Sequence, residues 1–241
     1  MKNALLIAGR EIRSYLRSPV GSIVAAAMLL ADGIWFQVKA VGDEPRLSAE
    51  VLFEFFNGTS GVVMIAAAIL CMRLIAQERE KRTFVLLNTA PVRDVEIVIG
   101  KYLALFGFLA GVTALTVYMP LLIFVNGRVS VSQILVGYLG IVLLGSAATA
   151  IGLFASALTR HQVVAVIVGS LMIGTLLMLW MVAKVTDAPV STFLNHLALH
   201  NLRQNPFMRG ELRFENVVFY VMMTYFFLLA ATKTLEARRW K

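Results

Sequence analysis

The stretch YLALFGFLAGVTALTVYMPLLIFV runs from Tyr102 to Val125 without a charged residue. A helix needs about 20 predominantly apolar residues to cross the hydrocarbon core of a bilayer, so this stretch predicts a membrane-spanning helix. Five further segments of the chain pass the same test. We therefore predict an all-α, polytopic membrane protein with six transmembrane helices, at residues 19–38, 55–76, 101–125, 130–158, 163–184 and 215–233.

The composition agrees with this prediction and excludes other classes of protein. Of the 241 residues, 59% are hydrophobic and 15% are charged. Soluble domains contain about 45–50% apolar and about 25% charged residues, and disordered chains are more polar still. Cys71 is the only cysteine, which excludes a disulfide framework and a Cys-x-x-Cys metal site. We expect one transmembrane domain over residues 1–241.

Residues 1–18 predict an amphipathic helix at the membrane surface. Charged residues interrupt any signal-peptide core in this segment. With about 100° between successive residues, one arc is apolar and the opposite arc is basic. The apolar arc holds Leu5, Ala8, Ile12, Tyr15 and Leu16, and the basic arc holds Lys2, Arg10, Arg13 and Arg17. Such a helix lies among the headgroups with its cations toward anionic membrane lipid.

The distribution of lysine and arginine predicts the orientation. If the N-terminus is inside, fifteen of these residues fall on the cytoplasmic side and seven on the other. This asymmetry across six spans favours both termini in the cytoplasm. The net charge of +8 is then explained by membrane topology, and it does not require a nucleic-acid partner.

Two of the predicted connections are long enough to carry a specific function. In the cytoplasmic segment 77–100, a mixed-charge run precedes apolar residues from Phe84 to Leu87. This combination suits docking onto another protein better than binding a phosphate, although a solvated loop with ordinary juxtamembrane cations is the simpler alternative. On the outer side, segment 185–214 predicts a short helix over residues 191–202.

The cytoplasmic segment resembles a known family. Its motif consists of Glu78-Arg79-Glu80-Lys81-Arg82-Thr83, Leu86-Leu87, Thr89-x-Pro91 and Gly100-Lys101. It resembles the first intracellular loop of the ABC-2 type permeases, which are membrane subunits of ABC transporters. The six-span topology fits that family along essentially the whole chain, and residues 235–240 resemble the end of gliding-motility-associated permeases. The family commonly has glycine before the threonine, where this chain has Arg82.

The resemblance implies a division of labour between subunits. In the family, this loop contains a coupling helix that fits a groove on a separate ATPase, and closure of two ATPases moves two permease halves. The ATPase-coupling residues implied here are Glu78, Arg79, Glu80, Lys81, Arg82, Thr83 and Phe84, with Arg160, His161 and Gln162 as a second, minor contact. The implied activity is export across or out of a bacterial cytoplasmic (inner) membrane.

The sequence has no G-x-x-x-x-G-K-[ST] phosphate-binding motif. We therefore expect ATP and Mg²⁺ to be bound by two copies of a partner ATPase, and this chain to hold no catalytic residue, cofactor or metal. The second permease half is either another copy of this chain or a different six-span protein.

Two other functions remain open at this stage. The first is mechanotransmission, in which ATPase motion passes to an extracytoplasmic partner and no cargo crosses the membrane. The second is a channel or polytopic enzyme that works without an ATPase.

Three further residues carry chemistry of their own. Asp32 interrupts the first span, and an intramembrane acid is a functional candidate by default. Its nearness to the outer interface, three residues before Trp35, supports an interfacial or interhelical role instead. His196 and His200 have a spacing that can bind a metal, but they lack the His-Glu-x-x-His pattern, so a structural or solvent-facing role is favoured.

Overall fold

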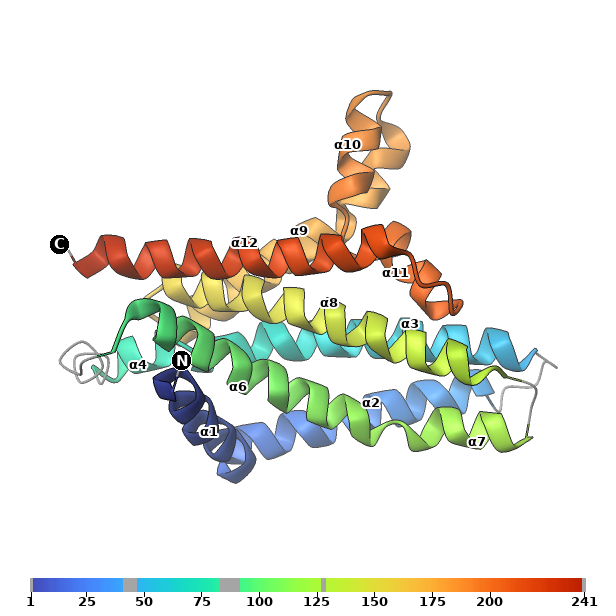
Figure 1. The fold of residues 1–241 in the computed structure, drawn as a ribbon, viewed down its shortest axis with the longest axis horizontal. Helices are drawn as coiled ribbons and strands as arrows, with labels where there is room; N and C mark the ends of the chain where they lie inside the picture. Colours follow the sequence, from blue (N-terminus) through green and yellow to red (C-terminus); the bar gives the residue numbers. More distant parts are fainter. Residues whose placement is uncertain (1, 41–46, 83–91, 127–128, 240–241) are drawn as a thin grey trace.

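The computed structural model describes residues 2–40, 47–82, 92–126 and 129–239. These residues form helices and contain no strand, and six helical segments are long and apolar enough to cross a membrane. The predicted all-α, six-span fold is confirmed. Figure 1 shows the long helices running side by side, with both chain termini at the same end of the bundle.

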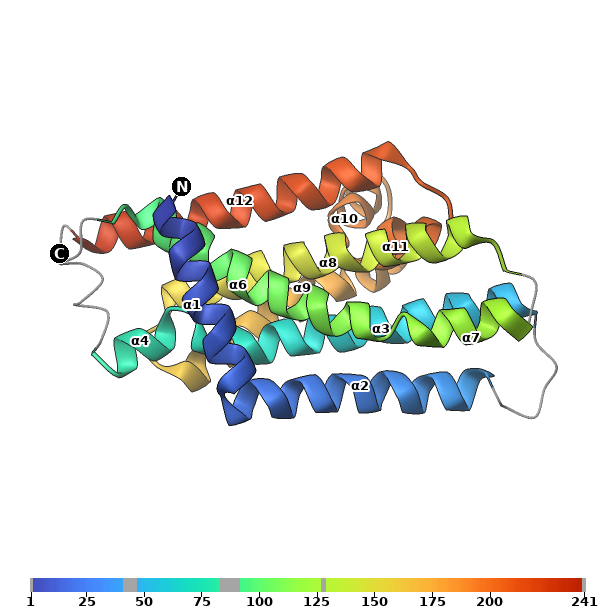
Figure 2. The same cartoon turned by 60° about the horizontal axis from the view of Figure 1, so that its bottom comes forward.

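The first part of the chain forms α1 (Lys2–Arg17), α2 (Pro19–Ala40) and α3 (Ser48–Leu70), followed by η1 (Cys71–Arg73) and α4 (Ala76–Glu80). Figure 2 shows α1 crossing the bundle obliquely over α6. The predicted apolar arc of α1 is divided between two environments. Ala8 and Tyr15 are buried, whereas Leu5 and Leu16 are exposed.

The second predicted span begins earlier than expected. Its helix, α3, starts at Ser48 rather than residue 55, and Val51 and Leu52 are buried in its first turns. The reason is packing against α8: Gln133 Nε2 of α8 donates to Ala49 O at 3.3 Å, and the ring of Phe56 lies against Gly137 of α8. The acids in the same turns lower the hydropathy without ending the helix.

The third predicted span, 101–125, is two helices, α6 (Asp94–Leu115) and α7 (Tyr118–Asn126). Pro120 has no N–H to bond the carbonyl of Thr116, so the regular i to i−4 bonding is interrupted in this turn. The adjoining bonds are of the tighter i to i−3 kind: Thr116 N donates to Thr113 O at 3.0 Å and Met119 N to Thr116 O at 3.0 Å. The break therefore has a local cause.

The remaining helices are α8 (Val131–Leu158), α9 (Gln162–Val185), α10 (Val190–Leu197), α11 (Asn201–Met208) and α12 (Phe214–Arg239). The single helix predicted over 191–202 is wrong, because α10 ends at Leu197 and α11 begins at Asn201. In the segment between α10 and α11, hydrogen bonds to other helices replace the backbone bonds of a continuous helix. Leu199 N donates to Leu176 O at 3.2 Å, and the Tyr220 hydroxyl donates to Leu199 O at 2.6 Å.

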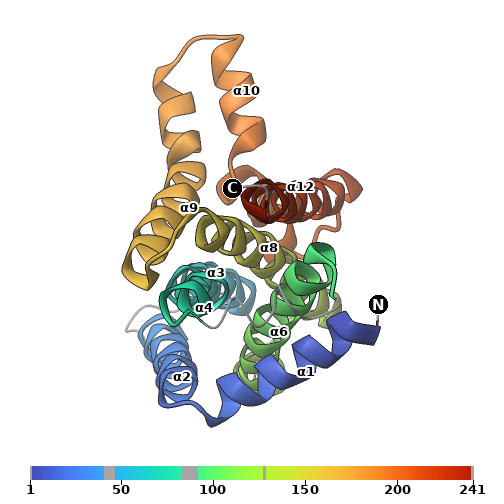
Figure 3. The same ribbon diagram turned by 90° about the vertical axis from the view of Figure 1, so that its left-hand side faces the viewer.

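α8 is the central helix and contacts α3, α6, α9, α11 and α12. Small residues make this possible, and at Gly152 an added Cβ would lie 2.7 Å from Cys71 Cβ. α2 and α9 lie at the edges and are mostly exposed. Figure 3 shows α10 beside α9, projecting from the rest of the bundle. We call the end of the bundle with both termini the α4 end, and the opposite end the α11 end.

Candidate functional site

At the α4 end, four parts of the chain meet: α1, α4, the start of α6, and the turn between α8 and α9. α4 is a single short helix that follows the sharp bend at Leu74, whose ψ is −83°. The hydroxyl of Ser156 in α8 accepts hydrogen bonds from the backbone N–H of Ile75 at 3.0 Å and of Ala76 at 2.9 Å. A side chain of another helix thus satisfies donors that α4 would otherwise leave unpaired at its N-terminus.

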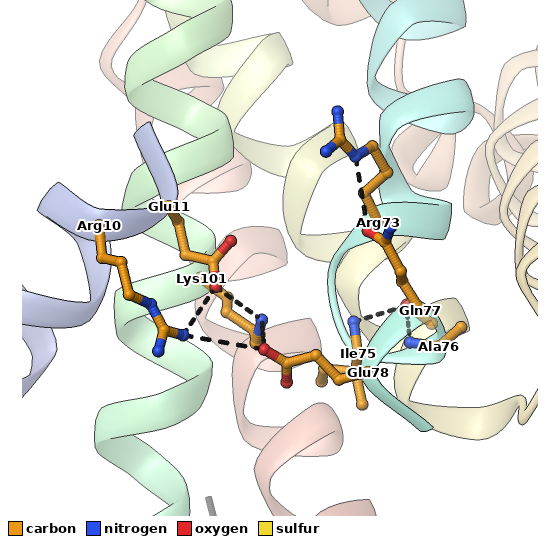
Figure 4. Close-up of polar contacts among 9 residues, drawn as sticks. Arg10, Glu11, Arg73, Ile75, Ala76, Gln77, Glu78 and Lys101 are labelled. Atoms are coloured by element: carbon orange, nitrogen blue, oxygen red, sulfur yellow. Dashed lines mark hydrogen bonds and ion pairs between the residues drawn. The ribbon is translucent and has the colours of Figure 1, made fainter. Parts of the chain in front are cut away.

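A charged cluster joins α4 to α1 and α6 (Figure 4). The Lys101 side chain is only 1% exposed, and its Nζ lies 2.8 Å from Glu78 Oε1 and 3.2 Å from Glu11 Oε1. Arg10 Nη2 lies 3.1 Å from Glu11 Oε1 and 3.9 Å from Glu78 Oε1. The two basic side chains balance the charge of the two carboxylates. This pairing offsets the free-energy cost of burying the Lys101 ammonium group.

Arg79 and Glu80 join α4 to the turn between α8 and α9. Arg79 Nη1 donates to Ala157 O at 2.6 Å and to Thr159 O at 3.2 Å, carbonyls at the C-terminal end of α8. Glu80 Oε2 accepts from the backbone N–H of Gln162, the first residue of α9, at 2.8 Å. The structure therefore brings together the two groups of residues that the resemblance implied.

The outward side of this region is basic. Lys81, Arg82, Arg160 and His161 are exposed, and so is Glu80, although its carboxylate bonds Gln162. Glu78 and Arg79 are half-buried and contact other parts of the chain. Arg82 follows the C-cap of α4 with φ of 57°, the left-handed conformation in which glycine is commonest. The glycine that the family commonly has here is explained by that conformation. Thr83 and Phe84 lie outside the described residues.

Sequence reasoning missed the partners that hold α4 in place. Lys101 begins an apolar run, so it looks like an ordinary juxtamembrane cation, and Ser156 looks like one more small residue for helix packing. Arg73, which precedes the bend, bonds the hydroxyl of Ser18 and lies 5.3 Å from the ring centroid of Tyr15. One available signal was the place of Lys101 in the Gly100-Lys101 pair of the loop motif.

The other predicted residues lie away from the α4 end. Asp32 is 1% exposed on α2, next to Thr59 of α3. His196 Nδ1 accepts from Arg203 Nη2 at 3.0 Å, and His200 Nε2 lies 2.7 Å from Ser60 Oγ. Burial lowers the pKa of His200, so its neutral form is favoured. The two histidines therefore bond different neighbours.

A profile of the ABC-2 family of transporter proteins matches residues 16–178, from the end of α1 through most of α9. The chain belongs to the ABC-2 family. It is accordingly a multi-pass membrane protein and the permease subunit of an ABC transporter, a class of subunit that acts with an ABC ATPase in a dimeric arrangement. The matched range includes α4 and the turn between α8 and α9. No curated protein matches the chain.

Proposed function

We propose that this ABC-2 permease couples ATP hydrolysis by a separate ATPase to export of a substrate across or out of a bacterial cytoplasmic (inner) membrane. Two permease halves, identical or different, would work with two ATPase subunits that bind the ATP and Mg²⁺. Both termini would then lie in the cytoplasm. The observation that carries this proposal is the attachment of α4 to three helices at once, α6, α8 and α9, through Ser156, Lys101, Arg79 and Glu80.

This attachment supports coupling because a displaced α4 could not move alone. Glu78 would pull on Lys101 in α6 and, through it, on Glu11 in α1. Arg79 and Glu80 would act on the end of α8 and the start of α9. A push delivered to α4 by an ATPase would therefore reach the spans directly.

The exposed bases indicate which side chains an ATPase would meet. Lys81, Arg82 and Arg160 face outward, so an acidic groove on the ATPase would complement them. Glu78 and Glu80, in contrast, bond within the chain. Reversing their charges would disturb the fold as well as coupling, and a double reversal at the exposed bases is the cleaner test.

The experiment isolates the native complex from membranes and identifies its subunits. We expect an ABC ATPase to co-purify and its ATP hydrolysis to be stimulated by the permease. The double variant Lys81→Glu, Arg82→Glu should lose both the co-purification and the stimulation of the ATPase. Arg209 is an exposed base at the α11 end, and Arg209→Glu should keep both properties. Full ATPase stimulation by the double variant would contradict the proposed docking surface.

The position of α10 favours mechanotransmission as a second candidate. α10 projects beside α9 with no buried residue of its own, and its Val190 and Phe193 are exposed by 51% and 65%. Such an apolar surface suits a partner protein. If a purified complex with active ATPase moves no cargo but binds an extracytoplasmic protein through α10, this second function replaces export.

A further inference from the structure

Asp32 is a buried acid inside the first span that coupling through α4 does not use. Among the α2 residues whose side chains are described, only Gly21, Met28 and Asp32 are buried. Their spacing of seven and four residues places them on a single face of the helix. Asp32 therefore lies on the narrow stripe by which α2 contacts the bundle, and its side chain is 1% exposed.

The surroundings of Asp32 provide no positive charge. Among the described residues no ion pair includes Asp32, and the groups acting on it are Thr59 of α3 and Tyr138 of α8. Of these two side chains, only Tyr138 is titratable. Asp32 Oδ1 and Thr59 Oγ1 are buried and make no hydrogen bond of standard geometry in the described part of the chain. The Thr59 hydroxyl lies beside the Asp32 carboxyl and is the neutral donor nearest to it.

The hydroxyl of Tyr138 cannot donate a hydrogen bond to the carboxylate of Asp32. Thr116 Oγ1 donates to Thr113 O at 2.7 Å, so its contact with Tyr138 Oη at 3.0 Å must use the hydrogen of the tyrosine. With that hydrogen engaged, the phenol oxygen can accept a bond but not donate one. An ionised Asp32 would thus be a buried anion that has a single neighbouring hydroxyl donor, Thr59, and no positive charge beside it among the described residues.

Such an anion is far more costly than a neutral carboxylic acid, which also gains a donor of its own. We propose that Asp32 is an intramembrane proton-binding site, occupied while α2 packs against α3. Separation of α2 from α3 would admit water and release the proton. Occupancy of the site would then report the position of α2, an edge helix with few other buried residues.

The test uses the full-length protein reconstituted in vesicles and needs no ATPase, so its outcome is independent of the proposed function. Dicyclohexylcarbodiimide adds to a protonated carboxylic acid in an apolar site and forms a stable N-acylurea, with no leaving group. We expect mass spectrometry to find this adduct on Asp32 near neutral pH and its loss as the pH rises. Glu50, an exposed acid in the first turn of α3, should not be labelled.

Asp32→Asn provides a second readout, because the amide has nearly the shape of the protonated acid. We expect it to keep the fold and to remove the fall in thermal stability that wild type shows as the pH rises. Absence of the Asp32 adduct in folded protein would overturn the proposal. Protection of Asp32 by Na⁺ at constant pH would also overturn it, since a metal cation would then occupy the site.

Discussion

The two ends of the bundle are held together by different chemistry. At the α4 end, charged side chains join the helices, with Lys101 between Glu78 and Glu11. At the α11 end, neutral side chains bond to backbone carbonyls, and the charged contacts that join helices include the Lys39–Glu54 pair at 3.4 Å and the bonds of Arg203 to His196 and Asn216. The Tyr220 hydroxyl lies 2.6 Å from Leu199 O, and Gln133 Nε2 donates to Ala49 O at 3.3 Å and Met208 O at 3.2 Å.

This difference matters for movement. A neutral hydrogen bond weakens steeply once its distance or angle departs from a narrow range. The attraction between opposite charges falls only as the inverse of their distance, so an ion pair survives a shift of its partners. We infer that the α4 end can be displaced as a connected unit, while the α11 end keeps its helices in register.

The largest effect is expected at the centre of the charged cluster. Lys101→Met removes the buried cation between Glu78 and Glu11 and leaves the two carboxylates with only the exposed Arg10. Breaking a buried pair in this way costs about 3–5 kcal/mol, so the free energy of unfolding in detergent should fall by about that amount. Adding Glu11→Gln and Glu78→Gln to the same variant should restore most of it. An unfolding free energy equal to wild type in the single variant would show that the cluster does not hold α4.

At the α11 end, Tyr220→Phe keeps the ring but removes the bonds to Leu199 O and Gln204 Oε1. Leaving such buried groups unpaired costs about 1–3 kcal/mol. Hydrogen exchange should accelerate in residues 198–208 and stay unchanged in α4. Tyr225→Phe on the exposed side of the same helix is the matched control. Equal acceleration at both ends would argue that the bundle moves as one body.

A smaller, stabilising effect is expected where α4 ends. Arg82 has φ of 57°, which costs a residue with a Cβ roughly 1 kcal/mol relative to glycine. Arg82→Gly should therefore raise the free energy of unfolding by up to about 1 kcal/mol. Arg82→Ala should give no such gain, because alanine also has a Cβ. A gain with alanine would assign the effect to the lost charge rather than to the backbone.

The smallest effect concerns pH at the α11 end. Because burial lowers the pKa of His200 in the folded protein, its contribution to stability is complete above the unfolded value of about 6.5. It is lost progressively as the pH falls below that value, when the unfolded state binds the extra proton. Thermal unfolding at several pH values should show this slope in wild type and a reduced slope in His200→Gln. An identical slope in the variant would exclude His200 as its source.

The fold could be predicted because the length of an apolar run is a property of sequence alone. The boundaries at Ser48 and between Leu197 and Asn201 could not, because packing and bonds from other helices set them. Pro120 was visible in the sequence, but a proline within an apolar run does not by itself show whether the helix bends or breaks.

The candidate site divides in the same way. Its charged run could be recognised from residues 78–82 and their resemblance to a family. Which of those residues face inward depends on Lys101, Glu11 and Ser156, residues distant in the sequence that only the folded chain brings together. For the same reason Glu78 looked like a docking residue, although it bonds within the chain.

The most direct measurement places a photo-crosslinking amino acid at Lys81 and, in a separate variant, at Arg209, in membranes that contain the native partners. Both positions are exposed, and they lie at opposite ends of the bundle. If ATPase motion enters through α4, the Lys81 position should crosslink to an ABC ATPase and the Arg209 position should not. Crosslinking of the ATPase from Arg209, or from neither position in correctly inserted protein, would contradict coupling through α4.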